Sequence, residues 1–170
     1  SYYLMVGAFA PNKRVDLAVK AFNQLKLPLK IAGRGQDEAY CRSIADENIE
    51  FHGTLSDKKL LELYQQARAL VFPGEDDFGI TPLEAQACNT PVIAYASGGA
   101  LETVTDQTGI FFSEQKEEAL CSAVQEMERS WKNFSPETFS NQTKLFKREN
   151  YRECMAATIQ NGFKAWKRKK

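Results

Sequence analysis

Short apolar runs alternate with segments of helical periodicity along the first 132 residues of the chain. The runs predict strands at Tyr3–Val6, Leu29–Ala32, Ile49–His52, Ala69–Phe72, Val92–Tyr95 and Ile110–Phe112. The segments between them predict helices at Val15–Leu25, Glu38–Asp46, Lys58–Ala67, Pro82–Cys88, Ala100–Asp106 and Lys116–Lys132. Because strand and helix alternate, we expect an α/β fold with a parallel sheet of six strands.

The predicted strands show little polar alternation, so helices should cover both faces of the sheet. The helix predicted at Val15–Leu25 has one apolar face at the i, i+3, i+4, i+7 spacing of a helix packed on a core. These features favour a Rossmann-like doubly wound fold. In such a fold, ligands bind beyond the carboxyl ends of the strands, near a reversal in strand order.

The pattern changes after Trp131, where only helical segments follow. One helix is predicted at Pro136–Phe146 with Ser135 as its N-cap, and a last helix runs from Glu149 to about Trp166. We therefore divide the chain into a Rossmann-like domain, residues 1–132, and C-terminal helices, residues 133–170.

Composition and charge narrow the class of protein. The chain has 170 residues, of which 43% are hydrophobic, enough for a sizeable core. Its 22 basic and 22 acidic residues balance, which offers no general attraction for nucleic acid. No apolar stretch approaches the roughly 18 residues of a membrane span, and no signal-peptide pattern is visible, so we expect a cytoplasmic protein. The four cysteines form no C-x-x-C pair, so neither a zinc site nor a disulfide framework is indicated.

The candidate chemistry lies in residues 72–102, which predict a strand, an acidic loop, a helix, a strand and a glycine loop. Thr81-Pro82 is typical of a helix start, so the amides from Phe78, Gly79 and Ile80 onward can meet an anion at the positive end of the helix dipole. Acids lie on both sides of this site, Asp76 before it and Glu84 one turn inside the helix. A phosphate flanked by hydroxyl groups indicates a nucleotide sugar.

At these residues the chain resembles the retaining glycosyltransferases of family 4, whose two-domain fold is called GT-B. The family's pattern of an acid, seven residues and Glu falls on Asp76 and Glu84, with Asp where the family usually has Glu. Other matches, over roughly the first two-thirds of the chain, are Gly7–Asp16, Ile31–Gly35, Phe51–Asp57 and Ser97–Glu102. An Arg that follows the first glycine in many relatives is Ala8 here.

The resemblance implies catalytic roles for three residues. Glu84 would accept hydrogen bonds from the ribose hydroxyls. Asp76 would contact the donor hexose or the phosphate region, unless it only caps the turn. Lys13 would neutralise the diphosphate leaving group, whose charge grows in the transition state, unless it is an exposed loop lysine. Arg14 is a second candidate cation.

The remaining predicted donor contacts come from backbone loops and the ends of strands. They are Gly7, Arg34, Leu55, Asp57, Phe78, Gly79, Ile80, Thr81, Gly98 and Gly99. Gly98 and Gly99 either let the backbone wrap the donor or only form a helix start, and Arg34 is either a ligand of the base or diphosphate or an exposed turn residue. Asp57 is either a helix N-cap or, with Leu55, a contact to the base, where a carboxylate suits the donors of guanine. We interpret His52, the only histidine, as structural.

The resemblance implies hexosyl transfer from a nucleotide diphosphate sugar with retention of configuration and without a metal or other cofactor. Residues 13–19 and 75–80 are similar to bacterial mannosyltransferases of lipopolysaccharide or capsule assembly, so GDP-mannose is the first donor to test, with a saccharide or lipid-linked acceptor. The matches cover the family's C-terminal half. We therefore expect an N-terminal domain outside this sequence, a final helix that packs back toward it, and no turnover by this fragment alone.

Three alternatives remain open. A sugar synthase that uses UDP- or ADP-glucose would share the donor motifs, and a non-catalytic nucleotide-sugar-binding module would share the pocket. A nicotinamide-binding domain needs Gly-x-Gly-x-x-Gly after its first strand, where this chain has Gly7-Ala-Phe-Ala-Pro.

The C-terminal segment Lys164–Lys170 carries five positive charges beside Trp166. It is either a solvated helix end, whose cations complement the helix dipole, or a contact to anionic lipid headgroups at the inner face of the cell membrane.

Overall fold

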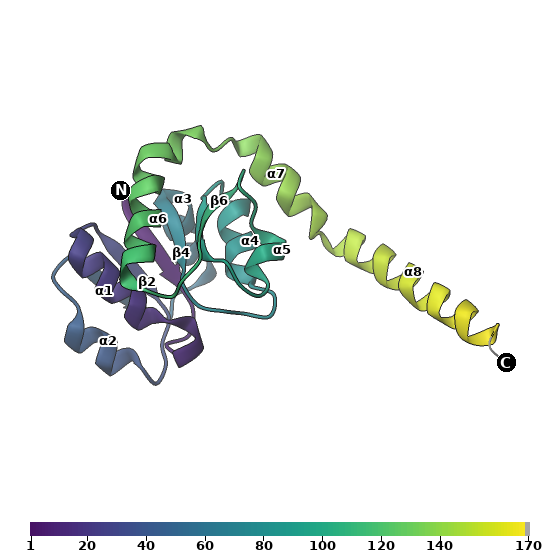
Figure 1. Cartoon of the computed structure of the whole chain (residues 1–170), viewed down its shortest axis with the longest axis horizontal. Coiled ribbons are helices and arrows are strands. Elements are labelled where there is room, and N and C mark those ends of the chain that lie inside the picture. The colour runs from purple at the N-terminus through teal and green to yellow at the C-terminus, as the bar shows by residue number, and fades with distance from the viewer. Residues whose placement is uncertain (169–170) are drawn as a thin grey trace.

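Six parallel strands form one sheet in the computed structural model, which describes residues 1–168 (Figure 1). The strands are β1 (Tyr2–Val6), β2 (Leu29–Ala32), β3 (Ile49–Gly53), β4 (Ala67–Phe72), β5 (Val92–Tyr95) and β6 (Gly109–Phe112). Their spatial order is β3-β2-β1-β4-β5-β6, and each neighbouring pair is parallel. The predicted six-stranded, doubly wound sheet is confirmed, and its strand order reverses between β1 and β4.

Eight α-helices and two 3₁₀ turns connect and extend the strands in this part of the chain. The helices are α1 (Val15–Leu25), α2 (Glu38–Ile44), α3 (Asp57–Gln66), α4 (Ile80–Ala87), α5 (Ala100–Thr103), α6 (Glu117–Ser130), α7 (Pro136–Leu145) and α8 (Arg148–Lys167). The 3₁₀ turns are η1 (Pro11–Lys13) and η2 (Trp131–Asn133).

Two apolar clusters lie on the two faces of the sheet. Strand β1 divides its side chains between them, because successive residues of a strand point to opposite faces: Tyr3 and Met5 enter one cluster, and Tyr2 and Leu4 the other. The first cluster packs against α1, α2 and α6, and the second against α3, α4 and α5. Helices therefore cover both faces, as the uninterrupted apolar strands predict.

Several helix ends differ from the sequence prediction. Helix α4 begins at Ile80 rather than Pro82, because Gly79 takes the left-handed conformation (φ +79°) at its N-cap. Helix α5 ends at Thr103 rather than Asp106, because Val104 is buried in an extended conformation. The expectation that Asp57 is an N-cap is wrong: Ser56 has the extended N-cap conformation, and Asp57 is the first residue of α3.

The C-terminal helices differ in how they pack. Ser135 is the N-cap of α7, as predicted, and its hydroxyl accepts a hydrogen bond from the Glu137 amide at 3.3 Å. Helix α7 packs on α4, with Phe139 buried. None of the 20 described residues of α8 is buried, and α8 extends away from the body (Figure 1). Of the predicted basic segment, Lys169 and Lys170 lie outside the described residues. In residues 1–168 no helix combines the length and hydrophobicity that a membrane crossing requires.

Candidate functional site

A pocket of about 350 Å³ lies at the carboxyl ends of β1 and β4, where the strand order reverses. It is lined by Val6, Gly7, Lys13, Phe72, Asp76, Asp77, Phe78, Gly79, Ile80 and Thr81. The predicted donor contacts Gly7 and Phe78 to Thr81 therefore share it with the candidate catalytic pair Lys13 and Asp76. We call it the acidic-loop pocket, after residues 73–79 between β4 and α4.

Lys13 and Asp76 form an ion pair across this pocket, from the Lys13 Nζ to the Asp76 carboxylate. The two residues are 63 positions apart, and the adjacency of β1 and β4 brings them together. The acidic loop also rests on η1: the Glu75 amide donates to the Asn12 carbonyl at 3.1 Å. A Cβ on Gly74 would lie 2.4 Å from that same carbonyl oxygen, so only glycine fits there. The Asp76 side chain is thus held by a cation rather than by its own turn.

Arg14 is not brought into this pocket. Its Nε donates to Asp16 at 3.2 Å and its Nη1 to Gln115 at 3.3 Å. Arg14 itself takes the left-handed conformation (φ 52°) between η1 and α1. Of the two candidate cations, the structure therefore brings Lys13 into the acidic-loop pocket and leaves Arg14 outside its lining.

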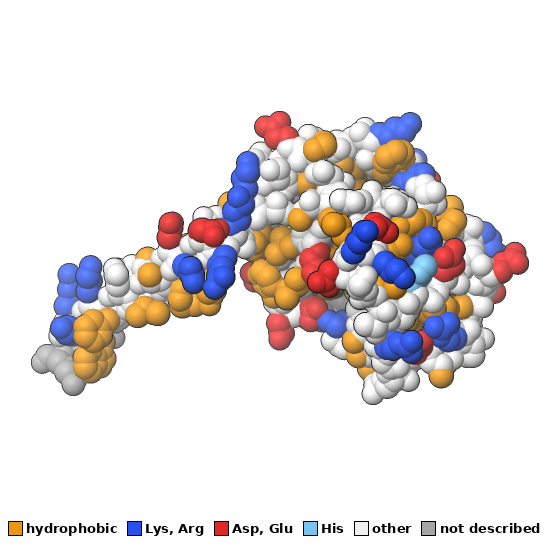
Figure 2. Space-filling model, turned by 180° about the vertical axis from the view of Figure 1, so that it is seen from behind, with side chains coloured by type: hydrophobic (Ala, Val, Ile, Leu, Met, Phe, Trp, Pro, Cys, Tyr) orange, Lys and Arg blue, Asp and Glu red, His pale blue; other side chains and the backbone are white. Residues whose placement is uncertain are grey.

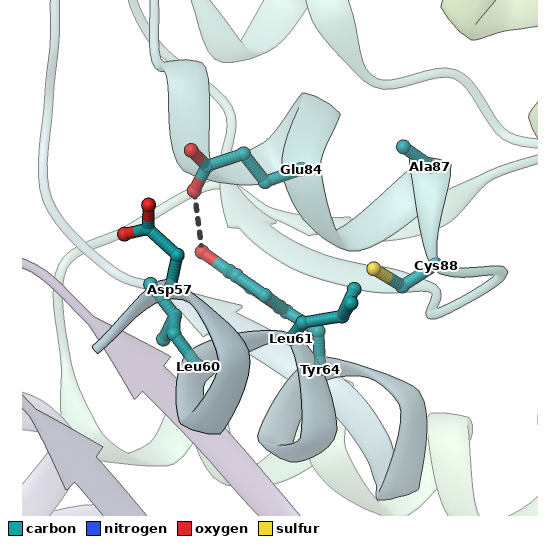
Figure 3. Close-up of a pocket in the computed structure, with 7 residues that line it drawn as sticks. All are labelled: Asp57, Leu60, Leu61, Tyr64, Glu84, Ala87 and Cys88. Atoms are coloured by element: carbon teal, nitrogen blue, oxygen red, sulfur yellow. Dashed lines mark hydrogen bonds between the residues drawn. The ribbon is translucent and has the colours of Figure 1, made fainter. Parts of the chain in front are cut away.

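Glu84 lies in a neighbouring pocket of about 290 Å³ between α3 and α4 (Figure 3). This pocket, which we call the α3–α4 pocket, is lined by Asp57, Leu60, Leu61, Tyr64, Glu84, Ala87 and Cys88. The Tyr64 hydroxyl donates a hydrogen bond to Glu84 Oε2 at 2.8 Å, and the Asp57 carboxylate lies on the same side of the pocket (Figure 3). Burial, and then the bond to Glu84, raise the pKa of Tyr64, so its hydroxyl stays protonated. Burial, with the Glu84 charge, also raises the pKa of Cys88.

A third pocket of about 230 Å³ lies at the ends of β1, β2 and β3. Its lining is Val6, Gly7, Ala8, Ala32, Gly33, Arg34, Gly53, Thr54, Leu55 and Leu60. It contains the predicted residues Arg34 and Leu55. Gly33 is required here, because its φ is +143° and a Cβ would lie 1.8 Å from the Gly7 carbonyl oxygen. His52 lines none of these three pockets and lies beside Glu50 on β3.

The third pocket adjoins each of the other two. Val6 and Gly7 line both the acidic-loop pocket and the third pocket, and Leu60 lines both the third pocket and the α3–α4 pocket. Together they follow the carboxyl edge of the sheet from β3 to β4.

Gly98 and Gly99 line none of these three pockets and instead touch the acidic loop. The Gly99 amide donates to the Asp76 carbonyl at 2.8 Å. A Cβ on Gly99 would lie 2.3 Å from the Phe78 Cα, and a Cβ on Gly98 would lie 2.5 Å from the Asp76 carbonyl oxygen. Both glycines therefore let the loop after β5 pack on the acidic loop.

The sequence interpretation named Asp57 and Glu84 but missed Leu60, Leu61 and Tyr64, which line the α3–α4 pocket with them. Asp57, Leu60, Leu61 and Tyr64 follow one another at the i, i+3, i+4, i+7 spacing of one helix face. That spacing indicates one shared helix face, but it is equally typical of a helix face that packs on the hydrophobic core. Among residues 1–168 no group of three His, Cys, Asp or Glu side chains is placed to hold a metal ion; metal independence stays a prediction.

Comparison with known proteins gives a family match over most of the chain. The model of the family "Glycosyl transferases group 1" matches residues 1–145. A GDP-mannose-dependent monoacylated alpha-(1-6)-phosphatidylinositol monomannoside mannosyltransferase from Corynebacterium glutamicum is 35% identical over 116 residues, which cover 59% of this chain and 30% of that protein. O-antigen chain mannosyltransferase C from Escherichia coli is 30% identical over 142 residues, 78% of this chain and 38% of that protein. The chain thus spans about a third of these curated relatives.

Solved structures share the fold. Sucrose-phosphate synthase from Thermosynechococcus elongatus superposes with a TM-score of 0.80 at 26% identity, over 96% of this chain and 46% of that one. The lipopolysaccharide outer core galactosyltransferase WaaB superposes with a TM-score of 0.82 at 17% identity, over 95% of this chain and 49% of that one. The second likeness concerns the fold alone.

Proposed function

The chain belongs to the group 1 glycosyl transferases, as a C-terminal domain of the GT-B fold, and from this premise we propose that it binds the nucleotide-sugar donor of a retaining hexosyltransferase. One observation carries the proposal: three adjoining pockets along the carboxyl edge of the sheet bring together Lys13, the start of α4 and Glu84. Each offers the chemistry that one part of such a donor requires.

The acidic-loop pocket would hold the diphosphate. The first turn of α4 presents backbone N–H groups that have no partner within the helix, together with the positive end of its dipole. Lys13, which is paired with Asp76, adds a cation to the lining of the same pocket. As the bond to the sugar breaks, negative charge grows on the diphosphate, so a fixed cation at this place stabilises the transition state more than the ground state.

The nucleoside would extend toward the α3–α4 pocket and the third pocket. Glu84 is exposed one turn inside α4, where its carboxylate can accept hydrogen bonds from two ribose hydroxyls. Asp57 lies on the same side of that pocket (Figure 3), where it can accept from the N1–H and N2–H₂ groups of a guanine. Arg34 and Leu55, in the third pocket, are further candidates for contact with the base.

We propose GDP-mannose as the donor. Support comes from Asp57 and from the two similar proteins, of which one is named as GDP-mannose-dependent and both as mannosyltransferases. The O-antigen name motivates a role in lipopolysaccharide assembly, with a saccharide or lipid-linked acceptor, in the cytoplasm or at the inner face of the membrane. A sugar synthase that uses UDP- or ADP-glucose is the second candidate, because the solved sucrose-phosphate synthase is 26% identical to this chain.

Helix α8 supports the proposal that further protein packs against this domain. Tyr151, Met155, Ile159 and Phe163 recur at every fourth residue and are exposed. Figure 2 shows apolar side chains along one side of the arm. We propose that this stripe packs on the other half of a GT-B enzyme, and that this chain by itself binds the donor without transferring the sugar.

The basic residues that follow the stripe leave lipid contact as a competing role. Lys164, Lys167 and Arg168 are the described members of that segment. If the segment binds headgroups, the variant with residues 167–170 changed to Gln should sediment less with liposomes that contain anionic lipid than the wild type does. Unchanged sedimentation with the liposomes would exclude that role.

Calorimetric titration of the chain with GDP, UDP, ADP, GDP-mannose and NAD tests the proposed function. We expect GDP to bind and the Glu84→Ala variant to lose most of that binding. Preference for UDP or ADP would favour the sugar synthase over the mannosyltransferase. Absence of binding to every nucleotide, with a cooperative thermal transition intact, would refute the donor-binding role.

A further inference from the structure

Glu84 has a buried hydrogen-bond partner, Tyr64, on the neighbouring helix. Glu84 is exposed on α4, whereas Tyr64 on α3 is only 3% exposed. The Tyr64 hydroxyl donates to Glu84 Oε2 at 2.8 Å across the α3–α4 pocket (Figure 3). A rigid, buried donor thus restrains a flexible, exposed carboxylate.

The position of the Tyr64 hydroxyl is set by the core. Its ring belongs to the apolar cluster formed by β1, β4, β5 and helices α3 to α5. The Thr90 hydroxyl donates to the Tyr64 backbone carbonyl at 2.6 Å, which ties this end of α3 to the segment before β5. The ring therefore cannot swing away from Glu84 without repacking the core, because closely packed interiors allow few alternative rotamers.

We propose that Tyr64 is a positioning residue for the donor. It holds Oε2 of Glu84, so that the carboxylate faces the pocket in one rotamer and accepts hydrogen bonds from the ribose hydroxyls. The inference rests on the donor-binding function proposed above. A carboxylate has about four lone-pair positions, so one bond from Tyr64 leaves enough acceptors for two hydroxyls. Tyr64 acts on the donor through its hydrogen bond to Glu84.

The phenol is suited to this task because it remains a donor. Burial and the neighbouring Glu84 charge both disfavour the phenolate, which would repel the carboxylate. An unrestrained glutamate would have to lose side-chain entropy each time a donor binds. We expect the Tyr64→Phe variant to bind the nucleoside diphosphate about 3- to 10-fold more weakly than the wild type.

The test compares two ligands and a matched variant. Wild type and Tyr64→Phe are titrated with GDP and UDP, and with the 2′,3′-dideoxy form of whichever nucleotide binds. Tyr3→Phe is the control, because Tyr3 is equally buried and donates to Glu128 Oε1 at 2.6 Å, away from the pockets. Both variants lose one buried tyrosine bond to a glutamate, so a general loss of stability should affect them alike.

The inference predicts weaker binding of the ribonucleotide by Tyr64→Phe, little change for the dideoxynucleotide, and no change in either for Tyr3→Phe. In a Glu84→Ala background, Tyr64→Phe should have no further effect on binding. Equal weakening for both nucleotides, or unchanged binding in Tyr64→Phe, would overturn the positioning role while leaving the donor site intact. A wild type that binds no nucleotide would refute the proposed function and this inference with it.

Discussion

Substitution of Gly99 by alanine is the sharpest test of how the acidic loop is held. Gly99 has an ordinary helical backbone conformation (φ −64°), so alanine introduces no backbone strain. Its new Cβ would lie 2.3 Å from the Phe78 Cα, 2.4 Å from the Phe78 oxygen and 2.5 Å from the Phe78 carbonyl carbon. All three are backbone atoms, which cannot rotate away, so the acidic loop itself must move by about 1 Å to restore ordinary contact.

The expected cost follows from this displacement. Overpacking of a closely packed site costs about 1–3 kcal/mol, and the hydrogen bond from the Gly99 amide to the Asp76 carbonyl, worth about 1 kcal/mol, is weakened. We expect the free energy of unfolding to fall by about 2–3 kcal/mol. For a domain of this size, that corresponds to a Tm lower by roughly 5–10 °C. Nucleotide affinity should fall as well, because the displaced loop carries Phe78 and Gly79 at the start of α4.

Thermal unfolding followed by circular dichroism, together with calorimetric titration of GDP, measures both effects. Gly162→Ala is the matched control, because a Cβ on Gly162 meets no atom within 4 Å and alanine favours the helix. Its Tm should not fall. If Gly99→Ala kept the wild-type Tm and lost only nucleotide binding, Gly99 would contact the donor directly, and its packing on the acidic loop would not explain the loss.

Three further predictions concern charge, the core and pH. Lys13→Gln should weaken GDP binding about fivefold, and Asp76→Asn should strengthen it by a similar factor. The reason is that a unit charge about 4 Å from the phosphate is worth about 1 kcal/mol even in water. Titration calorimetry measures both affinities. Leu70→Ala should lower the free energy of unfolding by about 3–5 kcal/mol in urea titrations, because Leu70 is fully buried in the sheet. Tyr64→Phe should reduce the loss of stability at alkaline pH. The pKa of Tyr64 is raised above its ordinary value of 10.0, so above pH 10 the unfolded chain releases this proton before the native protein does. The free energy of unfolding of the wild type therefore falls by up to about 1.4 kcal/mol per pH unit because of Tyr64.

Each of these predictions has its own control. Shifts of the same sign in both charge variants would mean that the ion pair shapes the pocket without a phosphate nearby. Leu61→Ala, at a residue 47% exposed, should cost much less than Leu70→Ala. Tyr151→Phe removes an exposed tyrosine from α8 and should leave the alkaline slope unchanged. An identical slope in Tyr64→Phe would contradict the buried, protonated phenol.

The strands and the acid pair can be predicted because both depend on neighbours in sequence. Strand β2 is predicted at its observed bounds because three of its four residues, Leu29, Ile31 and Ala32, are apolar. Asp76 and Glu84 flank a helix start that short-range rules identify, although the start itself is at Ile80 rather than Pro82. The difference arises from Gly79, whose left-handed conformation is one of several that glycine adopts at no cost.

Residues whose role depends on distant neighbours are predicted less well. Lys13 and Arg14 are adjacent and alike in charge, yet Lys13 pairs with Asp76, whereas Arg14 bonds to Asp16 and Gln115. Asp57 resembles a helix cap in sequence, but Ser56 holds that place and leaves the Asp57 carboxylate in the α3–α4 pocket. The roles of Gly98 and Gly99 in packing the acidic loop are equally invisible in sequence, since no local pattern shows which backbone a glycine touches.

By itself, the sequence determined the alternation of strands and helices, the burial of both sheet faces and the acidic motif at the start of α4. The side-chain periodicity of a helix or strand is set within a few residues, so each short segment of the sequence carries the pattern that identifies its own element. The tertiary structure alone decided the strand order β3-β2-β1-β4-β5-β6, and with it the meeting of Lys13 with Asp76 and of Tyr64 with Glu84. Those contacts join residues 63 and 20 positions apart, and they form only because many packing interactions across the whole core together favour one arrangement of the strands.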